Sequence, residues 1–432
     1  MKIDRKKLMA SLKIVNQVTK TNGRYPYEKH VMIDGENQKI YATDLNSVVS
    51  IPLEITDYKQ TMQISGVPIP DEITNSDQLR AYAKEKGVKL SAKIKDPAEL
   101  IKAFLAATAK ETVVCESCCL PGKDLLTIID RMTDEIVEIK PTDNKQGMLF
   151  DTALAFSIGN NFSDIYGMPI NEYPEVTIPA MKEGETSKVT FNAKHADYLL
   201  HAALKENDNS HGYAAWQLQG FFCDFKENTA VATDVHRLHK APLVSMTPKD
   251  DKTMGMFVPA ITVRLAKSLE GKMEEITAEY NGIVIQVQGP NGEIIQTRCE
   301  TFTYPNWKDV YYVSPDHMTI EKSDLEKPLT QAMVLSSKDT RNVKFKFNGG
   351  IDLEFRNSDR GIYQNAQIPI KDKTYGEKAI EVAMNGTYVM DALKLASKDG
   401  DKIEIAVNLD EPGHPIVFSA GELTALVMPC RM

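Results

Sequence analysis

The 432-residue sequence has no apolar run long enough to cross a membrane. Its first residues, MKIDRKKLMASLK, place charged side chains among the apolar ones, so the apolar core of a secretory signal is also absent. We therefore expect a protein of the cytoplasm. Hydrophobic residues make up 42% of the chain and charged residues 26%, which is typical of a folded, soluble protein. The length favours roughly two to four domains over a single core.

Cysteine is scarce, and its distribution argues against two kinds of site. The six cysteines stand at positions 115, 118, 119, 223, 299 and 430, and only the first three cluster, as CESCC. A structural zinc site needs a second pair of Cys or His residues at a suitable spacing, and none follows nearby. The scattered remainder argues against a disulfide framework. We expect reduced thiols in and beside a strand, and neither a metal nor a cofactor.

Familiar catalytic signatures are missing as well. The sequence has no phosphate loop of the GxxxxGK[ST] type, no GxSxG elbow and no HExxH pair. One segment still invites a chemical interpretation, because ATDVHRLHKAPL (232–243) places Asp234, His236 and His239 close together. In an extended strand, however, residues three apart point to opposite faces, so the two histidines would not share a metal ion. A metal-dependent hydrolase is therefore only the remote alternative.

A second segment indicates that part of the 232–243 sequence has a structural rather than a chemical role. Residues 42–53, ATDLNSVVSIPL, keep the Ala-Thr-Asp opening and the Pro-Leu close but contain neither histidine nor arginine. We interpret the shared residues as a repeated strand and turn. The two copies differ at His236, Arg237 and Leu238.

The whole chain repeats one plan, in which a short strand runs into an amphipathic helix and then into several strands. In the middle third, matched strand ends lie 66 residues apart (191 to 257), and in the last third 64 residues apart (320 to 384). In the first third we match Ile3 with Ile94, 91 residues further on. Each third is therefore expected to be a tandem duplication.

The first third is longer than the others by about 25 residues on this matching. We place the surplus between Thr56 and Ala92, where NSDQLRAYAKEKG predicts a short helix from Asn75 to Gly87. The following helix is expected to begin at Pro97 and to be the second repeated helix of this third.

Six copies of one βαβββ-like unit predict an α+β protein of three similar domains: residues 1–185 with an insertion around 56–92, residues 186–310 and residues 311–432. Two such chains would place about twelve helices around a ring. The net charge of −9 argues against nucleic acid as a partner, yet residues 4–24 carry six basic side chains and one acidic one. A solvated helix face and a face turned toward phosphate are both open.

Four segments, in this order and spacing, resemble the bacterial DNA polymerase III beta subunit, the DNA sliding clamp: ATDVHRL (232–238), YPNWKDV (304–310), NGTYVMDAL (385–393) and VMPCRM (427–432). The resemblance implies a head-to-tail homodimeric ring whose inner helices face duplex DNA and whose outer sheets form the rim. It also implies a non-catalytic processivity factor of DNA replication. Its partners would be double-stranded DNA, the polymerase catalytic subunit, the clamp loader and other proteins that carry clamp-binding motifs.

In this family a hydrophobic cleft between the middle and last domains binds short peptide motifs. Carried over by matching segments, the cleft would be lined by Leu218, Thr233, His236, Arg237, Leu238, Pro305, Val310, Asn385, Tyr388, Val427, Met428, Pro429 and Arg431. Apolar walls with a few polar groups suit an extended peptide. Two residues depart from the family pattern, because Val235 replaces a common glycine and Asp309 stands where a basic residue is frequent. A branched side chain at 235 could narrow the groove.

The resemblance also suggests contacts with DNA and between subunits. The DNA-facing candidates are Arg24 first, then Lys6, Lys13, Arg264, Lys267 and Lys394. The candidates for the ring interface are Phe156 and Ile158 on one edge and Val334 and Leu335 on the other, with ordinary core packing as the alternative for all four. The alternative function is that of a clamp-like accessory or mobile-element-encoded binding protein altered in loading or ring closure.

Overall fold

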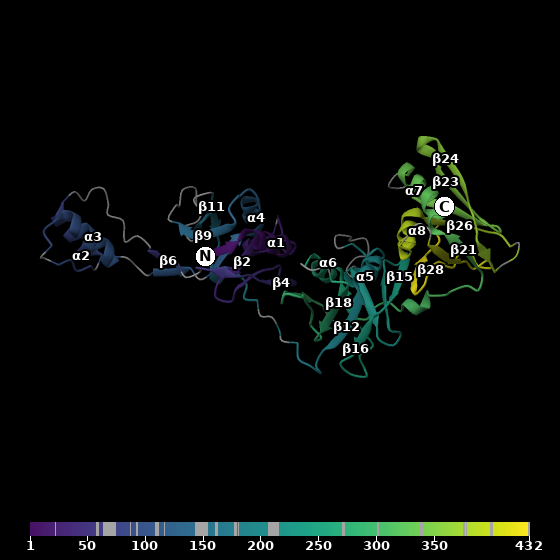
Figure 1. Cartoon of the computed structure of the whole chain (residues 1–432), viewed down its shortest axis with the longest axis horizontal. Coiled ribbons are helices and arrows are strands. Elements are labelled where there is room, and N and C mark those ends of the chain that lie inside the picture. Colours follow the sequence, from purple (N-terminus) through teal and green to yellow (C-terminus); the bar gives the residue numbers. More distant parts are fainter. Residues whose placement is uncertain are drawn as a thin grey trace. The chain divides into compact units, whose positions relative to one another are not determined.

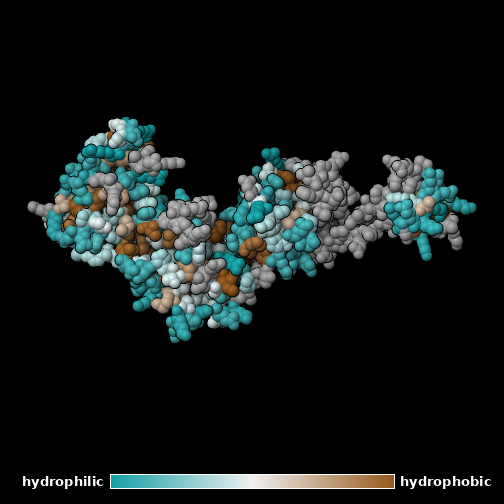
Figure 2. All heavy atoms as spheres, turned by 180° about the vertical axis from the view of Figure 1, so that it is seen from behind, coloured by the Kyte–Doolittle hydropathy of each residue, from teal (hydrophilic) through white to brown (hydrophobic). Residues whose placement is uncertain are grey.

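A computed structural model describes the chain except residues 22, 58–59, 64–74, 87, 92–93, 109–111, 116, 143–153, 160–162, 177–178, 180, 206–215, 270–272, 300–301, 337–340, 375, 377, 398–400 and 431–432. The chain forms two compact units (Figure 1). Unit 1 comprises Met1–Thr177 with Asn291–Ile294, and unit 2 comprises Ile178–Pro290 with Ile295–Met432. Within the described residues no helix is long and apolar enough to cross a membrane. On the face drawn in Figure 2, hydrophobic patches interrupt a mostly hydrophilic surface.

Unit 2 confirms the predicted repeat, because a strand runs directly into a helix four times. These pairs are β12 (Ser187–Asn192) with α5 (Ala193–Leu200), β17 (Gly255–Pro259) with α6 (Ala260–Ser268), β21 (His317–Glu321) with α7 (Lys322–Leu335), and β26 (Ile380–Asn385) with α8 (Gly386–Ala392). The Asn192 side chain accepts hydrogen bonds from the first backbone N–H groups of α5, and Asn385 does the same for α8. Asparagine is favoured at this position because it satisfies amides that have no partner inside the helix.

One nine-stranded sheet runs through unit 2 in the order β17-β13-β14-β15-β29-β28-β27-β21-β25. Its strands not yet defined are β13 (Gly220–Asp224), β14 (Thr229–Thr233), β15 (Arg237–Pro242), β25 (Asp372–Lys373), β27 (Lys402–Ala406), β28 (Ile416–Ala420) and β29 (Leu423–Val427). The antiparallel pairing of β15 with β29, which sets Leu238 opposite Leu426, joins the middle and last thirds of the chain.

The other strands of unit 2 form two groups. Beside β12 lie β16 (Ser245–Thr247) and β18 (Glu275–Tyr280), and β19 (Val284–Gln288) pairs with β18; β20 is Ile294–Arg298. A four-stranded sheet has the order β24-β23-β22-β26, with β22 (Asn342–Phe347), β23 (Ile351–Asn357) and β24 (Ile362–Ile368). Asn348-Gly349-Gly350 connects β22 and β23 as a hairpin, in which Phe347 pairs with Ile351.

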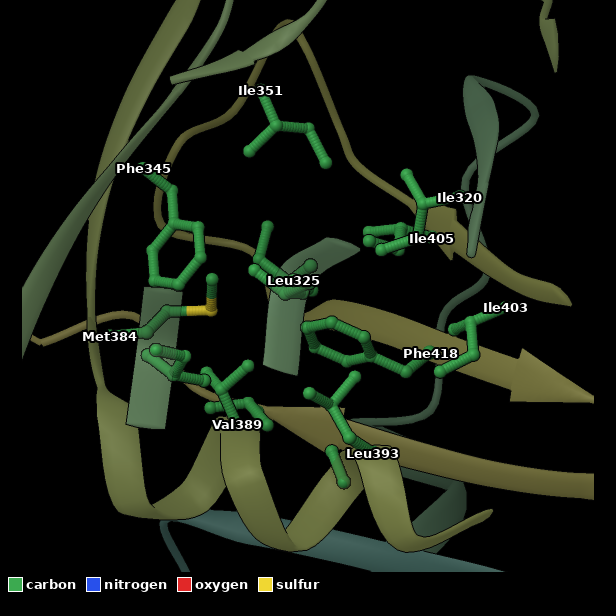
Figure 3. Packing of buried hydrophobic residues seen from close by; sticks show 14 of the residues in the cluster. Ile320, Leu325, Phe345, Ile351, Met384, Val389, Leu393, Ile403, Ile405 and Phe418 are labelled. Carbon is green, nitrogen blue, oxygen red and sulfur yellow. The ribbon is translucent and has the colours of Figure 1, made fainter. Parts of the chain in front are cut away.

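The core of the last third lies between its two sheets and under α7 and α8. Figure 3 shows Leu325, Phe345, Val389 and Phe418 packing together from four different elements, and each is at most 1% exposed. Burying large apolar side chains is the main stabilising contribution to such a layer. The helix α7 begins directly after Glu321, and no side-chain hydrogen bond caps its start.

Unit 1 contains the same pattern. Its elements, apart from the extra segment described next, are β1 (Lys2–Asp4), α1 (Arg5–Val15), β2 (His30–Asp34), β3 (Lys39–Thr43), β4 (Ser47–Pro52), β5 (Ile55–Thr56), β8 (Ser117–Pro121), α4 (Gly122–Asp130), β9 (Ile136–Thr142), β10 (Leu154–Ile158) and β11 (Ser163–Gly167). One sheet has the order β11-β10-β9-β1-β5, and β4, β3, β2 and β8 are successive neighbours in another.

An extra segment of unit 1 lies between β5 and β8. It consists of β6 (Gln60–Gln63), α2 (Ser76–Glu85), α3 (Pro97–Thr108) and β7 (Thr112–Cys115). The strands β6 and β7 pair with each other, and α2 and α3 lie side by side (Figure 1). Leu79, Ala83, Leu100 and Phe104 form a hydrophobic cluster of their own between the two helices. The short helix expected after Asn75 is therefore confirmed as α2.

The prediction that the helix at Pro97 is the second repeated helix of its third is wrong. That helix, α3, packs on α2, and the helix that directly follows a strand, as in the other repeats, is α4. Helix starts then lie 117 residues apart in unit 1 (5 to 122), against 67 (193 to 260) and 64 (322 to 386) in unit 2. A proline and an apolar periodicity mark a helix but do not say what it packs against. The domain boundaries near 185 and 310 stay predictions.

Candidate functional site

The turn between β14 and β15 is held by its own side chains. The Thr233 hydroxyl donates to the Arg237 carbonyl at 2.6 Å, and the Val235 amide donates to the same hydroxyl oxygen at 3.1 Å. The Asp234 carboxylate accepts the amides of His236 and Arg237 at 3.1 and 3.2 Å. Such local hydrogen bonds fix a turn without help from distant residues.

The first copy of this line forms the same turn. The Thr43 hydroxyl donates to Ser47 O at 2.9 Å, the Leu45 amide donates to the Thr43 hydroxyl, and Asp44 accepts the amide of Ser47 at 2.7 Å. Both turns also have one residue with positive φ, Leu45 at 72° and Val235 at 67°. The interpretation of the Ala-Thr-Asp frame as a repeated strand and turn is therefore confirmed.

Val235 is strained by this geometry. A positive φ is uncommon for any residue other than glycine and is a clear outlier for a β-branched side chain. The requirement comes from the turn, which explains why glycine suits the position. The Val235 side chain is 53% exposed, so it lies on the surface of the turn rather than in a core.

Arg237 is the most strongly held charged group of the site. Its Nε donates to the Asp234 carboxylate at 3.0 Å and its Nη1 to the Asp391 carboxylate at 2.5 Å. The guanidinium carbon lies 4.3 Å from the centroid of the Tyr388 ring, a cation–π contact. The His236 ring is nearly parallel to the same ring, with centroids 6.3 Å apart.

The two histidines of the segment lie in different surroundings. His239 is fully buried, stacks on the Tyr198 ring with centroids 4.4 Å apart, and has its Nδ1 2.7 Å from the Tyr198 carbonyl. Burial lowers the pKa of His239 to about 3, so the ring is neutral at physiological pH. His236 is exposed beside Tyr388. Across the described part of the chain, no group of three or more His, Cys, Asp or Glu residues is placed to hold a metal ion.

An apolar cluster lies beside the turn, around the Leu238 side chain. Leu238 belongs to a cluster with Trp307, and the partly buried Tyr311 and Met428 pack against it. The Met428 amide donates to the His236 carbonyl at 3.0 Å, which fixes the start of the terminal segment beside the turn. A flexible thioether next to aromatic rings suits an adaptable binding surface.

The structure brings most of the predicted cleft residues together. On and around the β14–β15 turn, β29 and the start of α8 lie Thr233, His236, Arg237, Leu238, Asn385, Tyr388, Val427, Met428 and Pro429. Val427 is fully buried and packs into the core of the last third rather than into the cluster around Leu238. Val310 is 44% exposed directly after the 3-10 turn at Trp307–Asp309.

Two predicted cleft residues are not joined to this group, and a third is not described. Leu218 is buried against Leu204 in a separate small cluster. Pro305 is exposed, and no described contact links it to the cluster around Leu238. Arg431 lies outside the described residues.

The sequence reasoning missed Asp391, Trp307 and Tyr311. Asp391 lies three residues after Tyr388 on a helix, and this spacing places both side chains on one face. That signal was present in NGTYVMDAL. For Trp307 and Tyr311 the sequence offered no signal, because their contact with β15 is made through the fold.

The predicted DNA-facing residues are all exposed. Lys6 and Lys13 lie two turns apart on one face of α1, and Arg264 and Lys267 lie one turn apart on α6. Lys267 forms an ion pair with Asp197. The other two are Arg24, which lies over the Tyr25 ring at 5.7 Å, and Lys394.

The four predicted interface residues divide into two groups. Phe156 and Ile158 are 1% and 0% exposed, and their strand β10 is covered by β11 on one side and β9 on the other. Core packing accounts for them, and they offer no surface to a partner. Val334, in contrast, is 74% exposed near the end of α7, and Leu335 is partly buried.

The structure also has a cavity of about 470 Å³. Aromatic side chains, among them Phe222, Phe302 and Tyr304, form its walls, and Lys249 and Lys252 lie at it. None of the predicted site residues lines it.

The sequence matches no family model and no curated protein. Solved structures do match along the whole chain. The DNA polymerase III subunit beta from Pseudomonas aeruginosa has 16% identity and a TM-score of 0.68, and that from Thermotoga maritima 17% and 0.67. A sliding clamp from Bartonella birtlesii bound to griselimycin has 17% identity and a TM-score of 0.70. Each alignment covers 100% of this chain and 99% of the other.

The chain has the sliding-clamp fold. The predicted α+β architecture of similar repeated domains is thereby confirmed, even though few residues are identical. In the sliding-clamp fold of this chain, the β14–β15 turn, α8 and the terminal segment form one continuous group of residues, which we call the cleft group: Thr233, His236, Arg237, Leu238, Asn385, Tyr388, Val427, Met428 and Pro429.

Proposed function

We propose that this protein is a DNA sliding clamp, a non-catalytic processivity factor that encircles duplex DNA as a homodimer and tethers a replicative polymerase. The observation that carries the proposal is the match of the whole chain to DNA polymerase III beta subunits, with 99% of those chains also covered.

The exposed basic residues support a contact with DNA. Lys6, Lys13, Arg264 and Lys394 lie on or directly after the helices that begin the repeats. Contacts of lysine and arginine with phosphate are independent of base sequence and are weakened by salt, which suits a ring that slides. The net charge of −9 then keeps other surfaces from adhering to nucleic acid.

The cleft group supports the binding of partner peptides. Two solved clamps with this fold, from Bartonella birtlesii and Pseudomonas aeruginosa, are bound to griselimycin. In this chain Leu238, Trp307 and Met428 supply an apolar wall, and Tyr388 and Arg237 supply a polar one. We infer that polymerase and clamp-loader segments bind here.

Two strand edges support closure into a ring. β11 ends one sheet of unit 1, and β24 ends the four-stranded sheet of unit 2. An edge strand has unpaired backbone groups that a second chain can pair with. Joining β11 of one chain to β24 of the next would give a head-to-tail arrangement, with Val334 beside it.

Retention on DNA tests the proposal directly. The protein is loaded onto nicked circular DNA with a bacterial clamp loader and ATP, and the circle is then linearised. We expect the protein to stay on the circle and to leave the linear form, because a ring slides off an open end. Equal retention on both forms would contradict topological tethering, and a monomer at micromolar concentration would favour the accessory binding protein.

The cleft has its own test. Met428→Glu places a charge in the apolar wall, and we expect it to abolish griselimycin binding in calorimetry while the dimer persists. Unchanged affinity would mean that the binding site lies elsewhere.

A further inference from the structure

Arg237 depends on two carboxylates and one ring. Asp234 holds its Nε from the same turn, and Asp391 holds its Nη1 from α8, while the guanidinium covers the Tyr388 ring. The Arg237 side chain is only 10% exposed. A guanidinium removed from water is stable only with such partners. Asp391 therefore helps to determine the position of Arg237 over the ring of Tyr388.

Asp391 also contacts two side chains outside the cleft, those of Lys394 and His201. Its Oδ1 accepts a hydrogen bond from Lys394 Nζ at 2.6 Å, and His201 Nδ1 lies 3.7 Å from the same oxygen. The side chains of Lys394 and His201 are 45% and 39% exposed, whereas that of Asp391 is 15% exposed. Although burial raises the pKa of Asp391, hydrogen bonds from Lys394 and Arg237 outweigh it and hold this pKa below its usual value. One carboxylate anion thus joins a buried cation of the cleft, Arg237, to one solvent-facing cation, Lys394.

We propose that Asp391 is a positioning residue of the cleft, which holds Arg237 against Tyr388, and that Lys394 tunes this hold from the other oxygen of the carboxylate. The inference rests on the proposed function in treating Arg237 and Tyr388 as cleft wall and Lys394 as a DNA-facing cation. It adds a residue that touches neither ligand and that links the two surfaces.

The direction of the link follows from charge. Lys394 and Arg237 are like charges on one carboxylate, so each weakens the attraction that the other feels. A DNA phosphate that draws Lys394 away leaves the anion to Arg237 and fixes the cleft wall more firmly. Because binding linkage is reciprocal, peptide in the cleft then favours DNA at Lys394 to the same degree.

Griselimycin binding to the full-length protein, measured by calorimetry, tests the positioning role. Asp391→Asn is expected to weaken binding by about tenfold, because an amide cannot replace the ion pair that orders Arg237. The matched control is Asp197→Asn. Asp197 also pairs with an exposed lysine, Lys267, but no described contact joins it to Arg237, so its variant should change the affinity less than about twofold.

A double-mutant cycle distinguishes the positioning of Arg237 by Asp391 from a general loss of structure in the Asp391→Asn variant. In an Arg237→Met background, Asp391→Asn should cost less than about twofold, because the residue through which it acts is gone. Full additivity of the two losses would overturn the positioning role while leaving the cleft in place. A wild-type protein that does not bind griselimycin would overturn the proposed cleft, and the inference with it.

Substitutions of two exposed lysines, Lys394 and Lys267, test the link between the cleft and the DNA-facing surface. Lys394→Met should tighten griselimycin binding about two- to fivefold, since it removes the competing charge as a phosphate would. Lys267→Met removes a similar charge from α6 and should leave the affinity within about 1.5-fold of wild type. Weaker binding by Lys394→Met, or equal affinities of the two variants, would overturn the link.

Discussion

At the scale of single residues, Val235 has a strained backbone conformation that the turn imposes. Its φ of 67° lies in the left-handed region, where a side chain costs about 1–2 kcal/mol. Glycine removes that cost but adds about 0.5–1 kcal/mol of unfolded-chain entropy. We expect Val235→Gly to raise the free energy of unfolding by about 1 kcal/mol, measured by urea denaturation. Val244→Gly, at an exposed valine outside the left-handed region, should lower the free energy of unfolding. A lower free energy of unfolding in both variants would show that Val235 is not strained.

His239 predicts a pH dependence of stability. Its folded-state pKa of about 3 lies below the ordinary value of about 6.5, so as the pH falls the unfolded chain binds the proton first. Stability is therefore lost as the pH falls from about 6.5 toward 3, by about 2 kcal/mol between pH 7 and pH 5. Urea unfolding at both pH values should show this loss, and His239→Gln should lack it. His236→Gln, at an exposed position of the same segment, should keep it; an unchanged slope in His239→Gln would refute the assignment.

At the scale of elements, the extra segment of unit 1 is built as an addition. Its hydrophobic cluster of Leu79, Ala83, Leu100 and Phe104 is separate from the neighbouring cores. Gln63 pairs with Thr112 at the end of the β6–β7 ribbon from which the chain continues to α2 and α3. A two-residue turn can therefore close the ribbon at this pair. Replacing residues 64–111 by Asn-Gly should leave the melting temperature of the remaining chain within about 2 °C.

The control for this deletion keeps the segment and breaks its core. Phe104→Ala should speed hydrogen exchange in α2 and α3, because removing a buried phenylalanine costs about 3–5 kcal/mol locally. The rest of the chain should exchange as in wild type. A fall of more than about 5 °C in the melting temperature of the deletion variant would mean that the segment supports unit 1.

The same scale shows what the sequence could predict. Alternating apolar residues around Asn348-Gly349-Gly350 gave the β22–β23 hairpin, and Asn385 marked the start of α8, because both signals are local. The role of α3 and the burial of β10 depend on which elements pack together, which local patterns do not contain. In the site, the turn residues were predictable from the repeat, and Leu238 was predicted from the resemblance to the clamp family. Trp307 was not, because its buried indole N–H donates to Asp224, 83 positions away, and this fixes it under β15.

At the scale of the whole molecule, repeats alone do not make a ring; two strand edges must meet. Among the described strands, β24 pairs with β23 on one side, and β11 pairs with β10 on one side. Directly after β11, Met168 forms a bridge with Cys119 of β8, so the end of this edge is partly covered. Phe156 and Ile158 lie behind β11 and stabilise the sheet that presents this edge. The proposed interface therefore depends on backbone pairing and on exposed residues near β24, rather than on the two buried residues.

Val334 provides the test of this arrangement. It is 74% exposed on α7, so a charge there should leave the fold of unit 2 intact. Burying a valine contributes about 1.5–3 kcal/mol, so Val334→Asp should weaken the dimer by roughly ten- to a hundredfold. In analytical ultracentrifugation we expect wild type at about twice the chain mass of 48.2 kDa and the variant shifted toward that mass. Val244→Asp, an equal change at another exposed valine, should remain dimeric. A dimer unaffected by Val334→Asp would place the subunit contact away from this end of α7.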